Sequence, residues 1–163
     1  MSVKDNGDVY FVPAFSGLFS PHWDETARGS LFGLTRFSNK SHMARAVLES
    51  VAFQTYELLE SMEKDLDTDF ESLKVDGGMV ANNLLMQFQS DILDKSIHSQ
   101  EINEITALGV GVASYLYVLD LPLSSMGNYI TSSKTWNPNM SNETRINYLE
   151  SWYKAIEKAK NWL

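Results

Sequence analysis

The chain has 163 residues, of which 44% are hydrophobic, and its formal net charge is −8 at pH 7. This length and composition suit one globular domain with a hydrophobic core. Nucleic-acid grooves and anionic membrane surfaces attract clustered lysine and arginine, so the acidic balance argues against both as partners.

Cysteine and histidine usage argues against a metal site. The chain contains no cysteine, which excludes disulfides and thiolate ligands. His22, His42 and His98 are scattered and match no metal-ligand spacing, so we expect ordinary imidazoles at all three. The polar residues 1–8 do not begin a signal peptide, and no apolar run approaches the roughly 20 residues that span a bilayer. We therefore expect a cytoplasmic protein.

Two strands joined by a loop are predicted near the start of the chain. Residues 8–15 are β-branched and aromatic, and residues 30–35 form a second strand antiparallel to them. The intervening residues 16–30 are rich in glycine, proline, serine and aspartate, which is typical of a loop. Its aromatic residues Phe19 and Trp23 either anchor the loop to the core or form the wall of a cleft.

A long helix is predicted next. Ser41 is the expected N-cap, and Glu57 is expected on the solvated side of the helix. The apolar residues that recur with the period of a buried helical face are Ala44, Val47, Leu48, Val51, Leu58, Leu59 and Met62.

Short strands and helices alternate in the second half. Residues 73–77 and 96–99 predict short strands, and residues 104–119 predict a helix whose small residues allow close packing on a sheet or helix. Residues 121–142 predict a loop, and residues 143–163 an amphipathic terminal helix. A further helix between the two strands is indicated by a buried stripe of Leu84, Leu85, Phe88 and Ile92. This order indicates an α/β fold.

The motif VDGGMVANN, residues 75–83, joins the strand at 73–77 to that further helix. An Asp-Gly pair between two strands usually forms a hairpin, but here a helical period follows the glycines. A strand, two glycines and a helix place a helix N-terminus at the mouth of an α/β sheet. Gly78 lets a planar base or a sugar approach bare backbone, and Asn82, about one helical turn further on, offers an amide suited to an adenine edge. The same residue types also serve simply as turn and cap formers.

Other catalytic patterns are not found in the sequence. Neither GxxxxGK[ST] nor GxGxxG occurs, which excludes a P-loop and weakens a dinucleotide-binding interpretation. No Ser–His–Asp arrangement can be defended. We interpret Asp24 and Glu25 as loop charges. Asp76 is interpreted as the acid of the turn that contains Gly77 and Gly78, called the glycine turn below.

Several long segments, in matching order, resemble the C-terminal half of glycerol kinases, which are members of the FGGY carbohydrate kinase family. The resemblance runs from about Asp8 to the terminus, and residues 121–142 are its least characteristic part. The segments that carry it are VYFVPAFSGLFSPHWDETARGSLFGLT (9–35), HMARAVLESVAFQT (42–55), VDGGMVANNLLMQFQSDIL (75–93), EITALG (104–109) and WYKAIEKAKNWL (152–163).

The resemblance implies an actin-like, ribonuclease H-like ATPase domain, with a mixed sheet flanked by helices. Residues 1–163 would form a single nucleotide-binding C-terminal domain, and the N-terminal domain that binds glycerol and the phosphates would be absent from this chain. Family members transfer the γ-phosphoryl group of MgATP to glycerol and are often homo-oligomers. The resemblance assigns nucleotide contacts to Gly78 and Asn82, with Gly77 in the same turn. It assigns no catalytic residue and no metal ligand to this chain, so magnesium would come with ATP or ADP.

Because phosphoryl transfer depends on positioning and charge stabilisation around the transferred group, we expect the isolated chain to be inactive. Two alternatives stay open. The chain could belong to another FGGY sugar kinase, such as one acting on a pentulose, or it could be a non-catalytic remnant that binds nucleotide or a partner.

Overall fold

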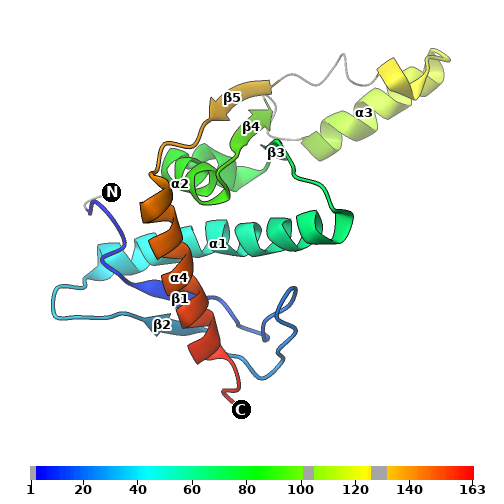
Figure 1. Ribbon diagram of the computed structural model, residues 1–163. Coiled ribbons are helices and arrows are strands. Elements are labelled where there is room, and N and C mark those ends of the chain that lie inside the picture. Colours follow the sequence, from blue (N-terminus) through cyan, green and yellow to red (C-terminus); the bar gives the residue numbers. More distant parts are fainter. Residues whose placement is uncertain (1–2, 101–104, 126–131) are drawn as a thin grey trace.

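The computed structural model describes residues 3–100, 105–125 and 132–163 (Figure 1). Its first element is a two-stranded antiparallel ribbon of β1 (Tyr10–Val12) and β2 (Ser30–Phe32), in which Tyr10 pairs with Phe32. The predicted pair of strands is therefore confirmed, although both are shorter than expected. Pro13 follows β1 directly, and because proline has no N–H it cannot extend the ladder.

The long helix α1 (Lys40–Leu66) is confirmed, but its predicted N-cap and most of its predicted buried face are wrong. Of the predicted apolar stripe only Leu59 is buried, and Val47, Leu58 and Met62 are exposed. The buried apolar residues of the helix are Ala46, Ala52, Phe53 and Leu59.

Asn39 caps the helix: its extended backbone lies outside the first turn, and its side chain accepts a hydrogen bond from the Ser41 N–H at 2.9 Å. In return, Nδ1 of His42 accepts a hydrogen bond from the Asn39 N–H at 3.2 Å, which completes a capping box. Ser41 already lies inside the helix.

The main sheet has three strands in the order β3–β4–β5. The strand β3 (Ser72–Val75) is parallel to β4 (Ser96–Gln100), and β4 is antiparallel to β5 (Ser132–Trp136). The sheet is therefore mixed, as predicted. The strand β5 was missed, because residues 121–142 were predicted to be a loop. Its polar sequence has no strand alternation, and its strand conformation depends on pairing with β4.

Three helices complete the described structure: α2 (Asn83–Leu93), α3 (Ile105–Val118) and α4 (Asn142–Ala159). The prediction that the last helix runs to residue 163 is wrong, because Lys160 has extended backbone angles. The following N–H, of Asn161, donates to Oδ2 of Asp24 at 3.1 Å, and this tertiary contact holds the chain outside the helix.

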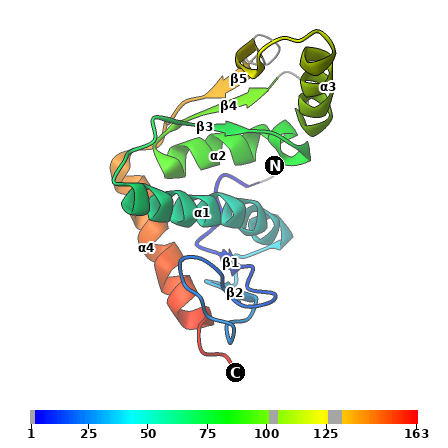
Figure 2. The same cartoon turned by 90° about the vertical axis from the view of Figure 1, so that its right-hand side faces the viewer.

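The helix α1 lies between the β1–β2 ribbon and α2, and the three-stranded sheet covers the other side of α2 (Figure 2). The helix α4 crosses these layers and contacts both β1 and α2. Phe53 of α1 is at the centre of the core: its ring stacks on Trp152 of α4, with centroids 4.9 Å apart and planes 11° apart. Phe88 of α2 and Tyr10 of β1 approach the same ring, at 5.5 and 5.9 Å.

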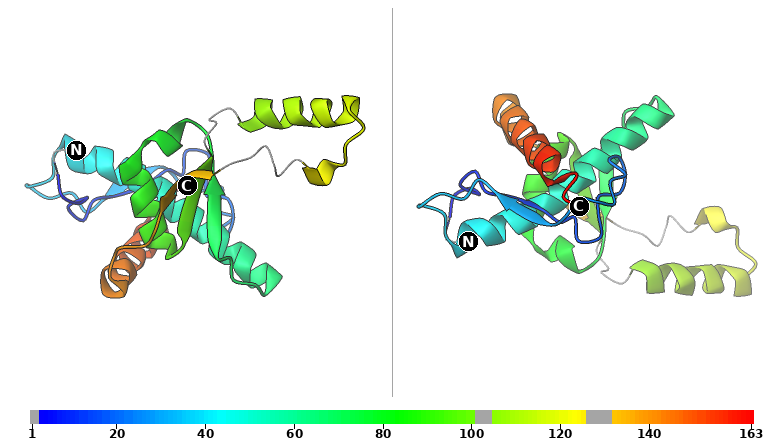
Figure 3. Two further views of the ribbon diagram at one scale, coloured as in Figure 1. Left: turned by 90° about the horizontal axis from the view of Figure 1, so that it is seen from above. Right: turned by 90° about the horizontal axis from the view of Figure 1, so that it is seen from below.

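The helix α3 projects away from this core (Figure 3). The small-residue packing predicted for it is not present among the described residues, because a Cβ built on Gly109 or Gly111 would meet no atom within 4 Å. Tyr117 and Val118 are 87% and 78% exposed. Within the described ranges, no helix is both long and apolar enough to span a membrane.

A buried carboxylate on α1 ties down the segment before β1. Glu49 is fully buried, and its Oε1 accepts a 2.6 Å hydrogen bond from Nε of Arg45. The guanidinium of Arg45 also donates to the carbonyl oxygen of Lys4 at 2.6 Å. Burial raises the pKa of Glu49 to about 7, although Arg45 acts to lower it.

This pKa shift predicts that the protein loses stability as pH rises from mildly acidic to neutral. Between an ordinary glutamate pKa of 4.5 and the folded value of about 7, the folded chain holds a proton that the unfolded chain has released. The free energy of unfolding should therefore fall by about 3 kcal/mol across this window and then level off. Denaturant titrations at about pH 5 and about pH 7.5 measure the change.

The variant Glu49→Gln keeps the shape of the side chain and removes its titration. The difference in pH dependence between wild type and variant isolates Glu49 from other groups that titrate in the same window. An equal pH dependence in the two proteins would contradict the assignment.

Candidate functional site

The predicted strand–glycine–helix arrangement is present at the end of β3. The chain leaves Val75, passes Asp76 and turns at Gly77, whose φ of +88° is a conformation that favours glycine. A short 3-10 helix, η1 (Gly78–Ala81), then leads to Asn82, the N-cap of α2. The turn thus brings two glycines and an asparagine to the sheet edge and the helix N-terminus, as the sequence predicted.

The geometry between Gly78 and Asn82 differs from the one expected. The two residues do not lie on one continuous helix, because the 3-10 turn intervenes and Asn82 has extended backbone angles. Oδ1 of Asn82 accepts hydrogen bonds from the N–H groups of Leu84 and Leu85, at 3.1 and 3.2 Å. This cap explains why asparagine, a poor helix former, stands at the start of α2.

The cap changes what Asn82 offers to a ligand. Its carbonyl oxygen is engaged by the helix, whereas its Nδ2 group has no hydrogen-bond partner among the residues that the structure describes. The side chain therefore presents a fixed donor. Such a donor suits an acceptor nitrogen of a purine ring.

The two glycines present bare backbone on an open surface. Gly77 and Gly78 are both exposed, and a Cβ built on either would meet no atom within 4 Å. Only Gly77 has a positive φ, so the turn requires glycine there for conformational reasons. At Gly78 the fold tolerates a side chain, and the absence of one leaves room for a flat group to lie on the backbone.

The acids considered in the sequence do not form a catalytic cluster. Asp24 accepts hydrogen bonds from the N–H and Oγ1 of Thr26, at 2.8 and 2.6 Å, and the hydroxyl bond is the main cause that lowers the pKa of Asp24. It is therefore a structural acid of the loop. Glu25 and Asp76 are exposed. In the ranges that the structure covers, no group of histidines and acids fits a metal ion.

The aromatic loop, residues 16–30, is not anchored to the core through Phe19 or Trp23. Phe19 and Trp23 are 68% and 75% exposed, while Leu18 and Ala27 are buried and hold the loop to the core. Phe19 lines a cavity of about 250 Å³, which agrees with a cleft wall for this residue.

A contact between His22 and Glu57, which both line this cavity, was not predicted. Nε2 of His22 lies 2.7 Å from Oε1 of Glu57, which is 4% exposed. The expectation of a solvated Glu57 is wrong, because the aromatic loop folds over that face of α1. Burial raises the pKa of Glu57, and His22 opposes the shift. Neither residue type nor spacing signals a pair 35 positions apart.

Comparison with known families places the chain among the carbohydrate kinases. A family model described as the C-terminal domain of the FGGY family of carbohydrate kinases matches residues 1–115, and the chain belongs to this family. The expected actin-like ATPase class, an α/β domain with a mixed sheet and flanking helices, is confirmed by the solved structures below.

Curated relatives that match the chain include glycerol kinases. The chain is 48% identical over 162 residues to the glycerol kinase of Corynebacterium kroppenstedtii, covering 99% of this chain and 32% of the relative. It is 50% identical over 167 residues to that of Nocardia farcinica, covering 99% and 34%. The chain therefore corresponds to the C-terminal FGGY domain of glycerol kinases and spans about a third of their length.

Solved structures agree with this assignment. A Plasmodium falciparum glycerol kinase with ADP superposes with a TM-score of 0.86 and 35% identity, covering 96% of this chain and 32% of that one. A ligand-bound xylulose kinase from Lactobacillus acidophilus gives a TM-score of 0.75 and 26% identity, covering 94% and 31%. The similarity is thus higher to the glycerol kinase than to the pentulose kinase.

The capping geometry predicts that two substitutions of Asn82 separate its structural role from its role as a donor. Asn82→Ala removes the cap and should lower the free energy of unfolding by about 1 kcal/mol. Asn82→Asp keeps an acceptor for the N–H groups of Leu84 and Leu85 and should change stability by less than about 0.5 kcal/mol. Denaturant titration of both variants measures these differences. Equal losses would contradict the cap.

Proposed function

We propose that this chain is the nucleotide-binding part of a kinase that transfers the γ-phosphoryl group of ATP to glycerol. The observation that carries the proposal is the bare Gly77–Gly78 backbone beside the fixed donor of Asn82. It occurs in a chain that has a glycerol kinase with ADP among its structural neighbours. In this arrangement the adenosine lies on the exposed glycine backbone, and Nδ2 of Asn82 donates to an acceptor nitrogen of the base.

The structure supports a binding role better than a complete catalytic one. Phosphoryl transfer requires cations around the transferred group and a positioned acceptor hydroxyl. Among the described residues no acid cluster fits a metal ion, so we propose that magnesium arrives with the nucleotide and is held by groups outside this chain. We likewise propose that the glycerol site lies in the two-thirds of the relatives that this chain does not cover.

The free edge of β3 and the exposed apolar surface of α3 favour contact with a further part of the protein. In the described structure β3 is an edge strand, and its free edge adjoins the glycine turn. The helix α3 is apolar around much of its circumference, yet Tyr117 and Val118 are largely exposed. A helix of this composition is normally buried. Both surfaces are consistent with a kinase that is completed by the remaining length of its relatives.

Glycerol is favoured over a pentulose as the acceptor. The relatives of known name at 48% and 50% identity are glycerol kinases, whereas the xylulose kinase structure is 26% identical. A remnant that binds nucleotide without catalysis would share the same turn and would also bind ADP.

Titration of ADP into the isotope-labelled chain should shift the backbone amide resonances of Gly77, Gly78 and Asn82. Gly78→Ala should leave the free energy of unfolding nearly unchanged, because its Cβ meets no atom within 4 Å and its φ is not positive. The methyl group should nevertheless weaken ADP binding by about tenfold, because it occupies the surface on which the ligand lies.

Gly109→Ala in α3 is the matched control, because this glycine also has no neighbour within 4 Å and lies in a different element. It should leave ADP binding unchanged. Equal ADP affinity in wild type and Gly78→Ala would contradict the proposed pose. A well-dispersed spectrum without ADP shifts would favour a remnant whose nucleotide site has been lost, or a site that forms only with its partner domain.

The purified chain should show no glycerol-dependent ATP turnover, because the groups that hold the phosphates and glycerol lie elsewhere in this proposal. A coupled assay for ADP release with and without glycerol measures this. Robust glycerol-dependent turnover by the chain alone would overturn the division of labour proposed here, even if ADP binding were confirmed.

A further inference from the structure

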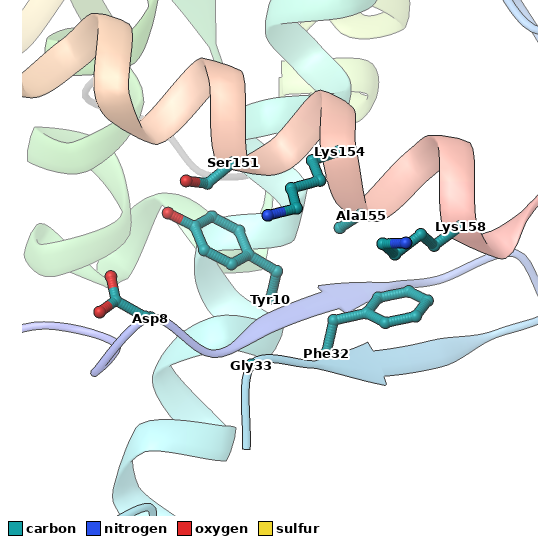
Figure 4. A pocket seen from close by; sticks show the side chains of 8 residues that line it. All are labelled: Asp8, Tyr10, Phe32, Gly33, Ser151, Lys154, Ala155 and Lys158. Carbon is teal, nitrogen blue, oxygen red and sulfur yellow. The ribbon is translucent and has the colours of Figure 1, made fainter. Parts of the chain in front are cut away.

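A cavity of about 310 Å³ lies between α4 and the β1–β2 ribbon, away from the glycine turn (Figure 4). Tyr10 of β1, Phe32 of β2 and Ala155 of α4 give it an apolar, partly aromatic floor. Tyr10 and Ala155 are buried, so this floor is held rigidly by the core. The volume is at the lower end of the range for sites that bind small molecules.

Two lysines from α4 line the same cavity. Lys154 and Lys158 are four residues apart and therefore lie on one face of the helix, where like charges repel each other. Neither has an ion-pair or hydrogen-bond partner among the described residues, in contrast to Lys95 and Lys160, which pair with glutamates. Two unneutralised ammonium groups thus adjoin an apolar floor in a chain of net charge −8.

The two ends of the cavity carry opposite charges. The hydroxyl groups of Tyr10 and Ser151 face each other near the ammonium group of Lys154 (Figure 4). Asp8 lies at the end opposite Lys158, where its carboxylate repels an anion. A bound anion is therefore favoured at the lysine end, and a ligand would have a defined orientation.

We propose that this cavity binds a small organic phosphate monoester. The phosphate group lies between the ammonium groups of Lys154 and Lys158, and the organic part lies on the rings of Tyr10 and Phe32. A phosphate monoester carries a charge of about −1.5 to −2 at neutral pH and so matches two ammonium groups, whereas one carboxylate neutralises only one. The site uses α4, β1 and β2 and is independent of the nucleotide site proposed at η1.

Phenyl phosphate is the probe, because it combines a phosphate monoester with a flat apolar ring. Added to the labelled full chain, it should shift the amide resonances of Gly33, Ser151 and Ala155, which line the cavity. Inorganic phosphate and phenol each supply half of the interaction and should bind at least about tenfold more weakly. The shifts should persist when ADP is present in excess, because the two sites use different elements.

The double variant Lys154→Gln/Lys158→Gln should lose at least about tenfold in affinity for phenyl phosphate. Both side chains are exposed, so the fold should be retained, and the dispersion of the spectrum reports this directly. The control is Lys40→Gln/Lys64→Gln, which removes the same net charge from exposed positions on α1.

Three outcomes would overturn the proposal. They are unchanged affinity in the Lys154/Lys158 variant, an equal loss in the Lys40/Lys64 control, and shifts that phenol reproduces at the same concentrations. The second would show a general effect of net charge, and the third would show binding to the apolar floor alone.

Discussion

The stacking of Phe53 on Trp152 is the contact on which the rest of the structure depends. Phe53 lies in the middle of α1 and Trp152 in the middle of α4, and both are almost completely buried. Phe88 of α2 and Tyr10 of β1 meet the same ring. One aromatic cluster therefore joins four elements from widely separated parts of the sequence. Burial of large aromatic side chains supplies much of the energy available to a core of this size.

This cluster also positions the candidate nucleotide site. Phe88 and Ile92 bury one face of α2, so the N-terminus of that helix, with Asn82, is held at the edge of the sheet. The glycine turn itself contributes little to the core, because Gly77 and Gly78 are exposed. A rigid helix next to an open turn is the arrangement expected where a ligand must lie on backbone without displacing side chains.

The buried acids of α1 attach this helix to neighbouring segments of the chain. Glu49 orients Arg45 toward the segment before β1, and Glu57 pairs with His22 of the aromatic loop. Each carboxyl group is buried and has one basic partner. Removing that partner leaves a buried polar group uncompensated, which is costly. These pairs therefore couple α1 to the loops around it.

The sequence alone determined the family and those helices and turns that depend on residues close together in the chain. Helical periodicity predicted α2 and α4, because a buried face imposes its period on neighbouring residues. It also predicted α1 as a helix, but most of the apolar stripe expected to be buried there is not. The glycine turn and its position between a strand and a helix were also readable, because glycine and asparagine act through their own backbone preferences. The segments that resemble glycerol kinases predicted the fold class that the solved structures confirm.

Only the tertiary structure decided features that depend on distant residues. The strand β5 exists through pairing with β4, the end of α4 follows from the contact between Asn161 and Asp24, and Glu57 is buried because a loop folds over it. For Asn82, too, part of the role was readable from the sequence and part only from the structure. Its position was predicted, but the use of its oxygen as a helix cap, which leaves one donor for a ligand, required the three-dimensional geometry. Long-range contacts of this kind leave no period in the sequence, so local patterns cannot predict them.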